Sequence, residues 1–162
     1  MSQTTFDQLG LPADLVAALA AQRITEPFAI QDLTVPDALD GRDILGRAPT
    51  GSGKTLAFGL PALARLGATD KAIKRRPRGL VLSPTRELAE QIQRELAPLA
   101  TSVRRRVAAV YGGAAITPQI RALGKGVDLL VACPGRLLDL IDQGEVALND
   151  VEIAIVDEAD RM

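Results

Sequence analysis

Short apolar runs alternate along the chain with longer segments in which apolar residues recur every three or four positions. Five runs are apolar almost throughout, as is typical of strands buried on both faces of a parallel sheet; they lie at 43–47, 79–82, 107–111, 127–132 and 151–156. The periodic segments predict helices at 56–66, 86–100, 116–124 and 136–143. Two earlier helices are expected, one after Pro12 and one over 27–40 that is interrupted near Pro36. The pattern predicts an α/β fold, a mostly parallel sheet flanked by helices on both faces.

Composition narrows the class of protein. The 162 residues suffice for one domain with its own core, and 47% hydrophobic with 24% charged residues is usual for a globular protein. Lys and Arg number 19 and Asp and Glu 20, so the net charge of −1 gives no overall attraction to nucleic acid, and any such site must be local. The single Cys133 and the absence of His exclude an internal disulfide and argue against a zinc site.

The sequence also bears on location. No apolar run reaches the length needed to span a membrane. The first residues, Met1 to Thr5, lack the basic and apolar pattern of a signal peptide. We therefore expect a cytoplasmic protein without a membrane partner.

Residues 48–55, here called the glycine-rich loop, read Ala-Pro-Thr-Gly-Ser-Gly-Lys-Thr between a predicted strand and a predicted helix. Gly51 and Gly53 allow positive φ and a close approach of the backbone to a ligand. Backbone N–H groups at a helix start favour an anion. Lys54 then suits the β- and γ-phosphates of a nucleotide, and the Thr55 hydroxyl suits Mg²⁺. An ordinary turn with a surface lysine is the alternative, but motif and flanks together favour a phosphate loop.

Every unusual motif directly follows a predicted strand. These motifs are the glycine-rich loop and residues 84–87, 112–113, 133–136 and 157–158. Ligands of open α/β sheets bind outside the carboxyl ends of the strands, so we expect the motifs to share one rim. On that rim Asp157 can hold Mg²⁺ opposite Thr55, and Glu158 can orient and activate the attacking water. Two solvated acids at the start of a loop are the alternative.

Asp157-Glu158-Ala159-Asp160 is the motif that names the DEAD-box RNA helicases, and the other motifs occur in that family's order. The glycine-rich loop, with Ala48 in its first place, resembles the family's phosphate loop. Further matches are Pro27 to Gln31 with the Q motif, 84–89 with motif Ia, Gly112-Gly113 with the GG motif, and 134–136 with motif Ib. The chain thus resembles the N-terminal RecA-like domain of an ATP-dependent RNA helicase, a P-loop NTPase. Residues 1–40 would form the Q-motif region with the N-terminal helices, and 41–162 the ATP-binding core.

The resemblance implies ATP and Mg²⁺ as ligands. Lys54, Asp157 and Glu158 would be catalytic, Thr55 and Asp157 would hold the metal, and Asp160 would link the site to a later motif. The remaining contacts to ATP would come from Phe6, Gln31, Thr50, Gly51, Ser52, Gly53, Lys54 and Thr55. Gln31 would read the adenine edge through its amide, and Phe6 would stack on the base. The open alternatives are a surface glutamine at Gln31 and a core anchor at Phe6.

The resemblance also implies RNA as partner, bound mainly through its phosphate backbone. The contacts would come from Thr85, Arg86, Gly113, Gly135 and Arg136, which position a strand without reading its sequence. Charges at a helix start and a surface arginine are the alternatives for Arg86 and Arg136. The chain departs from the family pattern at Cys133, where Thr is usual, and at Phe28, where Thr or Ser is usual. The basic loop over 71–78 is interpreted as a solvated loop.

The family continues beyond the equivalent of Met162 with a Ser-Ala-Thr strand and a second RecA-like domain that supplies arginine fingers. Without that strand the sheet is expected to be incomplete, with a gap between the strands at 43–47 and 151–156. We expect either a rearranged or swapped sheet, with a dimer as one form, or a truncated piece of a longer protein, and better binding of ATP than hydrolysis. A non-catalytic nucleotide- and RNA-binding module and a P-loop DNA helicase domain remain the alternatives; Gln31 and residues 85–87 argue against the second.

Overall fold

The computed structural model describes residues 4–162, so most of the stretch from Met1 to Thr5 lies outside the described residues. The helices are α1 (Ala13–Ala21), α2 (Ala29–Leu39), α3 (Lys54–Gly67), α4 (Arg86–Ser102), α5 (Ile116–Lys125) and α6 (Pro134–Asp142), with short 3₁₀ turns η1 (Asp7–Leu9) and η2 (Ala159–Arg161). The strands are β1 (Gly79–Leu82), β2 (Val107–Val110), β3 (Leu129–Ala132) and β4 (Ile153–Val156). The helix over 27–40 is confirmed, but Pro36 lies inside a continuous α2 rather than interrupting it.

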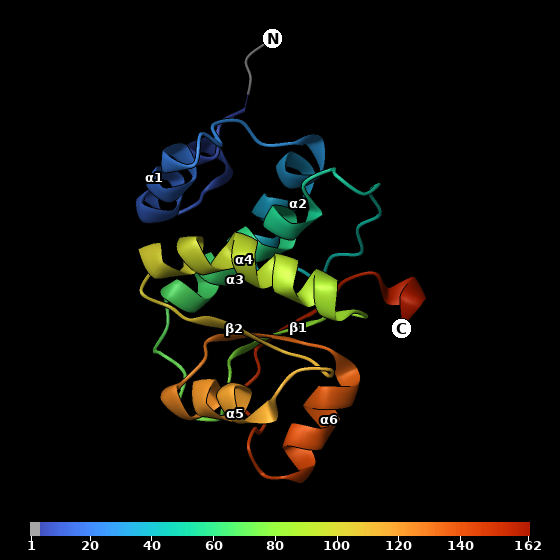
Figure 1. Cartoon of the computed structure of the whole chain (residues 1–162). Coiled ribbons are helices and arrows are strands. Elements are labelled where there is room, and N and C mark those ends of the chain that lie inside the picture. The colour runs from blue at the N-terminus through green and yellow to red at the C-terminus, as the bar shows by residue number, and fades with distance from the viewer. Residues whose placement is uncertain (1–3) are drawn as a thin grey trace.

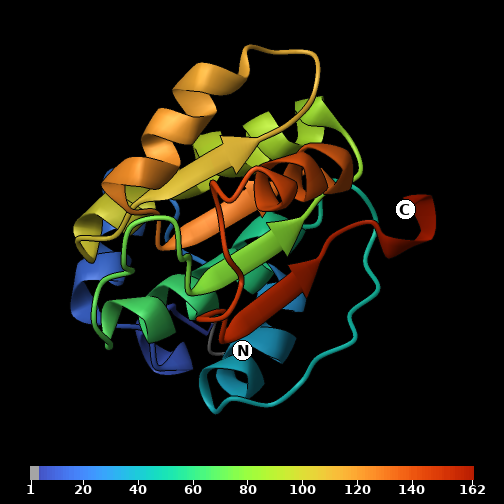
Figure 2. The ribbon, with the colours of Figure 1, turned by 90° about the horizontal axis from the view of Figure 1, so that it is seen from below.

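The four strands form one parallel sheet in the order β2-β3-β1-β4. Figure 2 shows the four arrows pointing the same way, with β4 outermost. Residues Val110, Ala132, Leu82 and Val156 lie opposite one another at the ends of the strands. The loops that follow all four strands therefore lie along one edge of the sheet, here called the carboxyl rim, as the sequence predicted for residues 84–87, 112–113, 133–136 and 157–158.

Helices cover both faces of the sheet, as predicted. Helices α1 to α4 lie on one side of the strands, and α5 and α6 lie on the other (Figure 1). Each face has its own apolar core, and β3 contributes to both, since Leu129 and Val131 face one cluster and Leu130 and Ala132 the other. All four β3 residues are buried, which explains why an unbroken apolar run was the correct signal for an interior strand.

The predicted strand at 43–47 is wrong. This segment has no regular secondary structure, Leu45 is fully exposed and Ile44 is 43% exposed. In Figure 2 it runs beyond β4 as an extended connection. A strand is stabilised by a neighbour that accepts and donates its ladder hydrogen bonds, and within the described residues no strand lies between this segment and β4. The apolar run therefore stays unpaired.

A groove lies where that neighbour would be. It occupies about 290 Å³ and is bounded by β4 on one side and by α2, α3 and the 42–48 segment on the others. Ile153 and Ile155 face it, and Val156 is 54% exposed although it belongs to an apolar strand. The sheet is thus open on the β4 side, in line with the expected incompleteness. In residues 4–162 β4 pairs with β1 alone, so the expected rearranged sheet is not formed within the chain.

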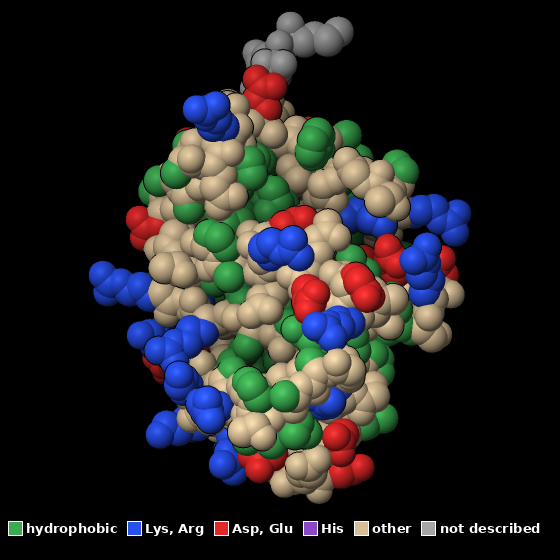
Figure 3. Space-filling model, viewed as in Figure 1, with side chains coloured by type: hydrophobic (Ala, Val, Ile, Leu, Met, Phe, Trp, Pro, Cys, Tyr) green, Lys and Arg blue, Asp and Glu red, His purple; other side chains and the backbone are tan. Residues whose placement is uncertain are grey.

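The basic loop is engaged in ion pairs with the segments around β4. Arg75 lies 3.6 Å from Glu145, Arg76 lies 3.0 Å from Asp150, and Arg78 is bonded to Glu152. Basic side chains gather on the left of Figure 3, the side on which the strands begin, opposite the carboxyl rim. These ion pairs link the basic loop to the residues that precede β4, in keeping with its interpretation as a surface loop.

Candidate functional site

The glycine-rich loop leads directly into α3. Gly51 and Gly53 adopt φ values of 82° and 83°, a conformation that favours glycine. The Ser52 hydroxyl donates to the Pro49 carbonyl at 2.5 Å and tightens the turn. Lys54 is the first residue of α3. The first N–H groups of a helix have no partner within it, and they form the positive end of the helix dipole. The loop therefore has the geometry of an anion site.

Gln31 packs against this loop and is hydrogen-bonded to it. It is 1% exposed, and its amide nitrogen donates to the Gly53 carbonyl at 3.0 Å while its amide oxygen accepts from the Phe28 N–H at 2.9 Å. A Cβ on Gly53 would lie 2.4 Å from the Gln31 nitrogen and 2.6 Å from a ring carbon of Phe28. Gln31 is therefore not the surface glutamine of the alternative interpretation. Each amide atom uses one of its two hydrogen-bonding positions in these contacts, so the amide retains one donor and one acceptor position.

Phe6 lies elsewhere. It is 2% exposed and packs in the core cluster with Leu9, Leu15 and Leu19. This placement favours the core-anchor alternative for Phe6. The exposed aromatic ring near the glycine-rich loop belongs instead to Phe28, which is 60% exposed and stands where the family usually has a hydroxyl residue.

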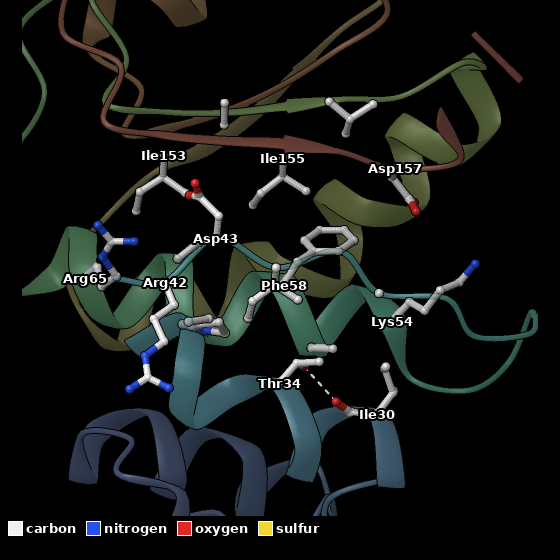
Figure 4. A pocket seen from close by; sticks show the side chains of 18 of the residues that line it. Ile30, Thr34, Arg42, Asp43, Lys54, Phe58, Arg65, Ile153, Ile155 and Asp157 are labelled. Carbon is white, nitrogen blue, oxygen red and sulfur yellow. Dashed lines mark hydrogen bonds between the residues drawn. The ribbon is translucent and has the colours of Figure 1, made fainter. Parts of the chain in front are cut away.

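Lys54 and Asp157 line the same groove, at the end shown on the right of Figure 4. Asp157 follows β4, and its N–H donates to the Leu82 carbonyl at 3.0 Å. Burial raises the pKa of Asp157, the Lys54 ammonium opposes this rise, and the Glu158 carboxylate adds to it. Thr55 is next to Lys54 in α3 but does not line the groove.

These residues suit Mg²⁺ only together with a nucleotide. The described residues contain no group of three or more Asp, Glu, Cys or His side chains that could hold a metal. Mg²⁺ in phosphate-transfer sites takes one or two protein oxygens and completes its shell with phosphates and water. One carboxylate and one hydroxyl beside an anion-binding helix start fit that donor set.

Glu158 has an unusual backbone. Its φ of 50° and ψ of 50° place a non-glycine residue in the left-handed region. The carboxylate lies 3.2 Å from the Arg161 guanidinium, three residues on. This left-handed turn reverses the chain after Asp157 and leads into η2, so that consecutive acids leave the strand in different backbone conformations.

The predicted RNA residues gather around the turn that follows β2. Thr85 caps α4 by accepting from the Leu88 N–H at 3.2 Å. Arg86 donates to the Gly113 carbonyl at 3.0 Å, and Arg136 donates to the Ala114 carbonyl at 3.2 Å. The two arginines thus hold adjacent carbonyls of one turn. Gly135 lies in the first turn of α6, next to Arg136.

Two further residues of this cluster were missed by the sequence analysis. Gln119 is 9% exposed; its amide bonds to Tyr111 and accepts from Arg136 at 3.0 Å. Glu90 accepts from Arg86 at 3.1 Å. Gln119 shares the helix face of Ile116, Ile120 and Leu123, where a polar residue stands out, and the Arg86–Glu90 spacing of four is a recognised helix pair. Both signals were present in the sequence.

The fold and these motifs together define an α/β protein with the architecture of RecA-like domains. The family model described as "DEAD/DEAH box helicase" matches residues 28–162. The chain belongs to this family.

Individual relatives are similar in sequence to this chain along nearly its whole length. DEAD-box ATP-dependent RNA helicase CshA of Streptococcus pneumoniae is 46% identical over 157 residues, 97% of this chain and 29% of the relative. ATP-dependent RNA helicase DBP2 of Encephalitozoon cuniculi is 48% identical over 160 residues, which are 97% of this chain and 32% of the relative. The crystal structure of the RNA helicase Prp28 from Chaetomium thermophilum, bound to ADP, superposes with a TM-score of 0.90 at 37% identity, covering all of this chain and 40% of that one.

The chain spans less than a third of the length of either of these two curated relatives. It corresponds to their N-terminal RecA-like domain, which agrees with the fold expected from the motifs. In residues 4–162 no helix is both long and apolar enough to cross a membrane.

Proposed function

We propose that this chain is the ATP- and RNA-binding part of an ATP-dependent RNA helicase that hydrolyses ATP and locally separates RNA duplexes. One observation carries the proposal: Lys54 and Asp157, which lie far apart in sequence, line one groove at the start of α3. The relatives named as ATP-dependent RNA helicases align over this entire span.

In this proposal the backbone of residues 50–53 cradles the phosphates of ATP and Lys54 neutralises the charge of the β- and γ-phosphates. Thr55 and Asp157 would hold Mg²⁺, whose charge polarises the γ-phosphate for attack. Glu158 would orient and deprotonate the attacking water. Gln31 would read the adenine, and Asp160 would connect the site to chain that follows.

RNA would lie across the carboxyl rim. Arg86 and Arg136 would offer guanidinium N–H groups to phosphate oxygens of the RNA. At Thr85, Gly113 and Gly135 the protein backbone would lie close to the RNA. Such contacts bind RNA without regard to sequence. Residues 1–40 would serve as the Q-motif region and 41–162 as the ATP-binding core, in the cytoplasm.

Turnover would require a second RecA-like domain carrying arginine fingers. Such a finger contributes roughly 10³ to 10⁵ in rate, or about 4–7 kcal/mol of barrier. We therefore expect the 162-residue chain to bind a fluorescent ATP analogue with Mg²⁺ and to hydrolyse ATP barely above background.

The test compares Lys54→Ala with Lys74→Ala, which removes a lysine of the basic loop on the opposite side of the sheet. Lys54→Ala should abolish binding of the analogue and Lys74→Ala should leave it unchanged. Equal affinity of wild type and Lys54→Ala would reject the site. In a longer protein with both domains, Glu158→Gln should abolish RNA-stimulated hydrolysis while ATP binding persists.

The open β4 edge adds a proposal on assembly. Isolated, the chain would pair through β4 with a second copy, as a swapped or edge-to-edge dimer, because an apolar strand with unpaired backbone groups is a template for another strand. Light scattering after size exclusion should then show a dimer fraction that grows with concentration.

A further inference from the structure

The Arg86 guanidinium is held by three groups at the carboxyl rim. Its Nε donates to the Glu90 carboxylate at 3.1 Å, and its Nη1 donates to the Gly113 carbonyl at 3.0 Å. Its central carbon lies 5.0 Å from the centre of the Tyr111 ring, within the range of a cation–π contact. Arg86 is therefore fixed between the start of α4 and the turn after β2.

These contacts limit how Arg86 can bind a phosphate. A guanidinium has five N–H groups, and it grips a phosphate best through two neighbouring groups on one edge. One edge of the guanidinium is formed by Nε and Nη2, and its Nε is hydrogen-bonded to the Glu90 carboxylate. The other edge is formed by Nη1 and Nη2, and its Nη1 is hydrogen-bonded to the Gly113 carbonyl. Gly113 and Tyr111 are neutral, whereas Glu90 occupies its edge with a negative charge that a phosphate must displace.

Glu90 remains charged in this position. Hydrogen bonds from Tyr111 and Arg86 lower the pKa of Glu90. The ion pair is nevertheless accessible, because the side chains of Arg86 and Glu90 are 44% and 36% exposed. Exposed pairs at a spacing of four are weak, so an RNA strand can open this one.

We propose that Glu90 competes with an RNA phosphate for Arg86 and so sets the affinity of the rim for RNA. Tyr111 and the Gly113 carbonyl keep the guanidinium in place, and Glu90 covers the edge that would bind the phosphate. Glu90 is a positioning residue, since it acts through Arg86. The inference rests on the proposed function, in which Arg86 contacts RNA.

The experiment measures binding of a fluorescein-labelled single-stranded U15 RNA to the whole chain by anisotropy at low salt. Glu90→Gln keeps the shape of the side chain and removes its charge, and should tighten binding about two- to fivefold, the range expected for breaking an exposed ion pair. The control is Glu95→Gln on the same helix, where Glu95 accepts from Gln91 at 3.1 Å. It removes the same charge without touching Arg86 and should leave the dissociation constant unchanged.

Arg86→Ala and the double variant Arg86→Ala with Glu90→Gln separate this mechanism from simple charge repulsion. Arg86→Ala should weaken binding, and Glu90→Gln should then give no further gain. A gain that persists without Arg86 would overturn the proposal, as would unchanged or weaker binding by Glu90→Gln alone. If Arg86→Ala does not weaken binding, the proposed RNA contact of Arg86 fails, which is a different result from a failure confined to Glu90.

Discussion

Replacing Gly53 with alanine tests whether Gln31 and the glycine-rich loop are packed as tightly as the structure shows. Gly51 and Gly53 have nearly the same φ, 82° and 83°. A Cβ on Gly53 meets the Gln31 nitrogen at 2.4 Å, whereas a Cβ on Gly51 meets nothing within 4 Å. Both substitutions therefore introduce the same backbone strain, and only Gly53→Ala adds a steric clash with Gln31.

The magnitudes follow from these contacts. An alanine in the left-handed region costs about 1–2 kcal/mol at either site. At Gly53 the methyl group must also displace Gln31, which is buried and bonded to the Gly53 carbonyl; a buried amide that loses its partner costs about 1–3 kcal/mol more. We expect Gly51→Ala to lower the free energy of unfolding by about 1–2 kcal/mol and Gly53→Ala by about 2–5 kcal/mol.

Thermal unfolding of the chain measures both values. For a domain of this size 1 kcal/mol shifts Tm by about 2–4 °C, so Gly53→Ala should lose clearly more than Gly51→Ala. In a Gln31→Ala background Gly53→Ala should cost little more than Gly51→Ala does in the wild type, because the clash with Gln31 is gone and the exposed Phe28 ring can move aside. Equal losses for the two glycine variants would show that Gln31 does not pack against this loop.

Three further predictions concern other parts of the site. Gln119→Ala should destabilise the chain by about 1–3 kcal/mol in thermal unfolding and weaken RNA binding, because Arg136 loses a buried partner; unchanged RNA affinity would contradict the role of Gln119. Asp157→Asn should raise the urea midpoint of the nucleotide-free chain, since burial raises the pKa of Asp157 and disfavours its charge, while Mg²⁺-dependent ATP binding falls. Lower stability of this variant would refute that reasoning. Val156→Lys should shift the chain toward monomer in light scattering by charging the open edge of β4; a wild-type chain that is already monomeric at every concentration would remove the basis for this expectation.

Most of the sheet could be predicted from local sequence because its interior strands are apolar without interruption. The predicted strands 79–82, 107–111, 127–132 and 151–156 are all present, shortened by at most two residues at one end. The same signal failed at 43–47 because apolarity records a tendency to be buried and does not supply a neighbouring strand. Where no strand lies alongside in residues 4–162, the run is left extended and exposed.

The sequence placed Asp157 at the carboxyl rim because it follows a buried strand. Lys54 lines the same groove as the first residue of α3, although the strand predicted before it is absent. The bond from Gln31 to Gly53 joins residues 22 apart, and the bond from Arg86 to Gly113 joins residues 27 apart. Such contacts depend on how α2 and α4 pack in three dimensions, which a motif does not encode.

The left-handed backbone of Glu158 affects the stability of the chain, independently of the charge of this residue. Glycine would adopt the same conformation freely, so a glutamate there makes the chain about 1–2 kcal/mol less stable than it could be. Arg23, Arg75 and Arg104 also have positive φ, so the penalty bears on function only at Glu158, whose carboxylate is the proposed base for the attacking water. A glycine variant that melts higher and no longer supports turnover in a two-domain protein would display this trade-off at a single position.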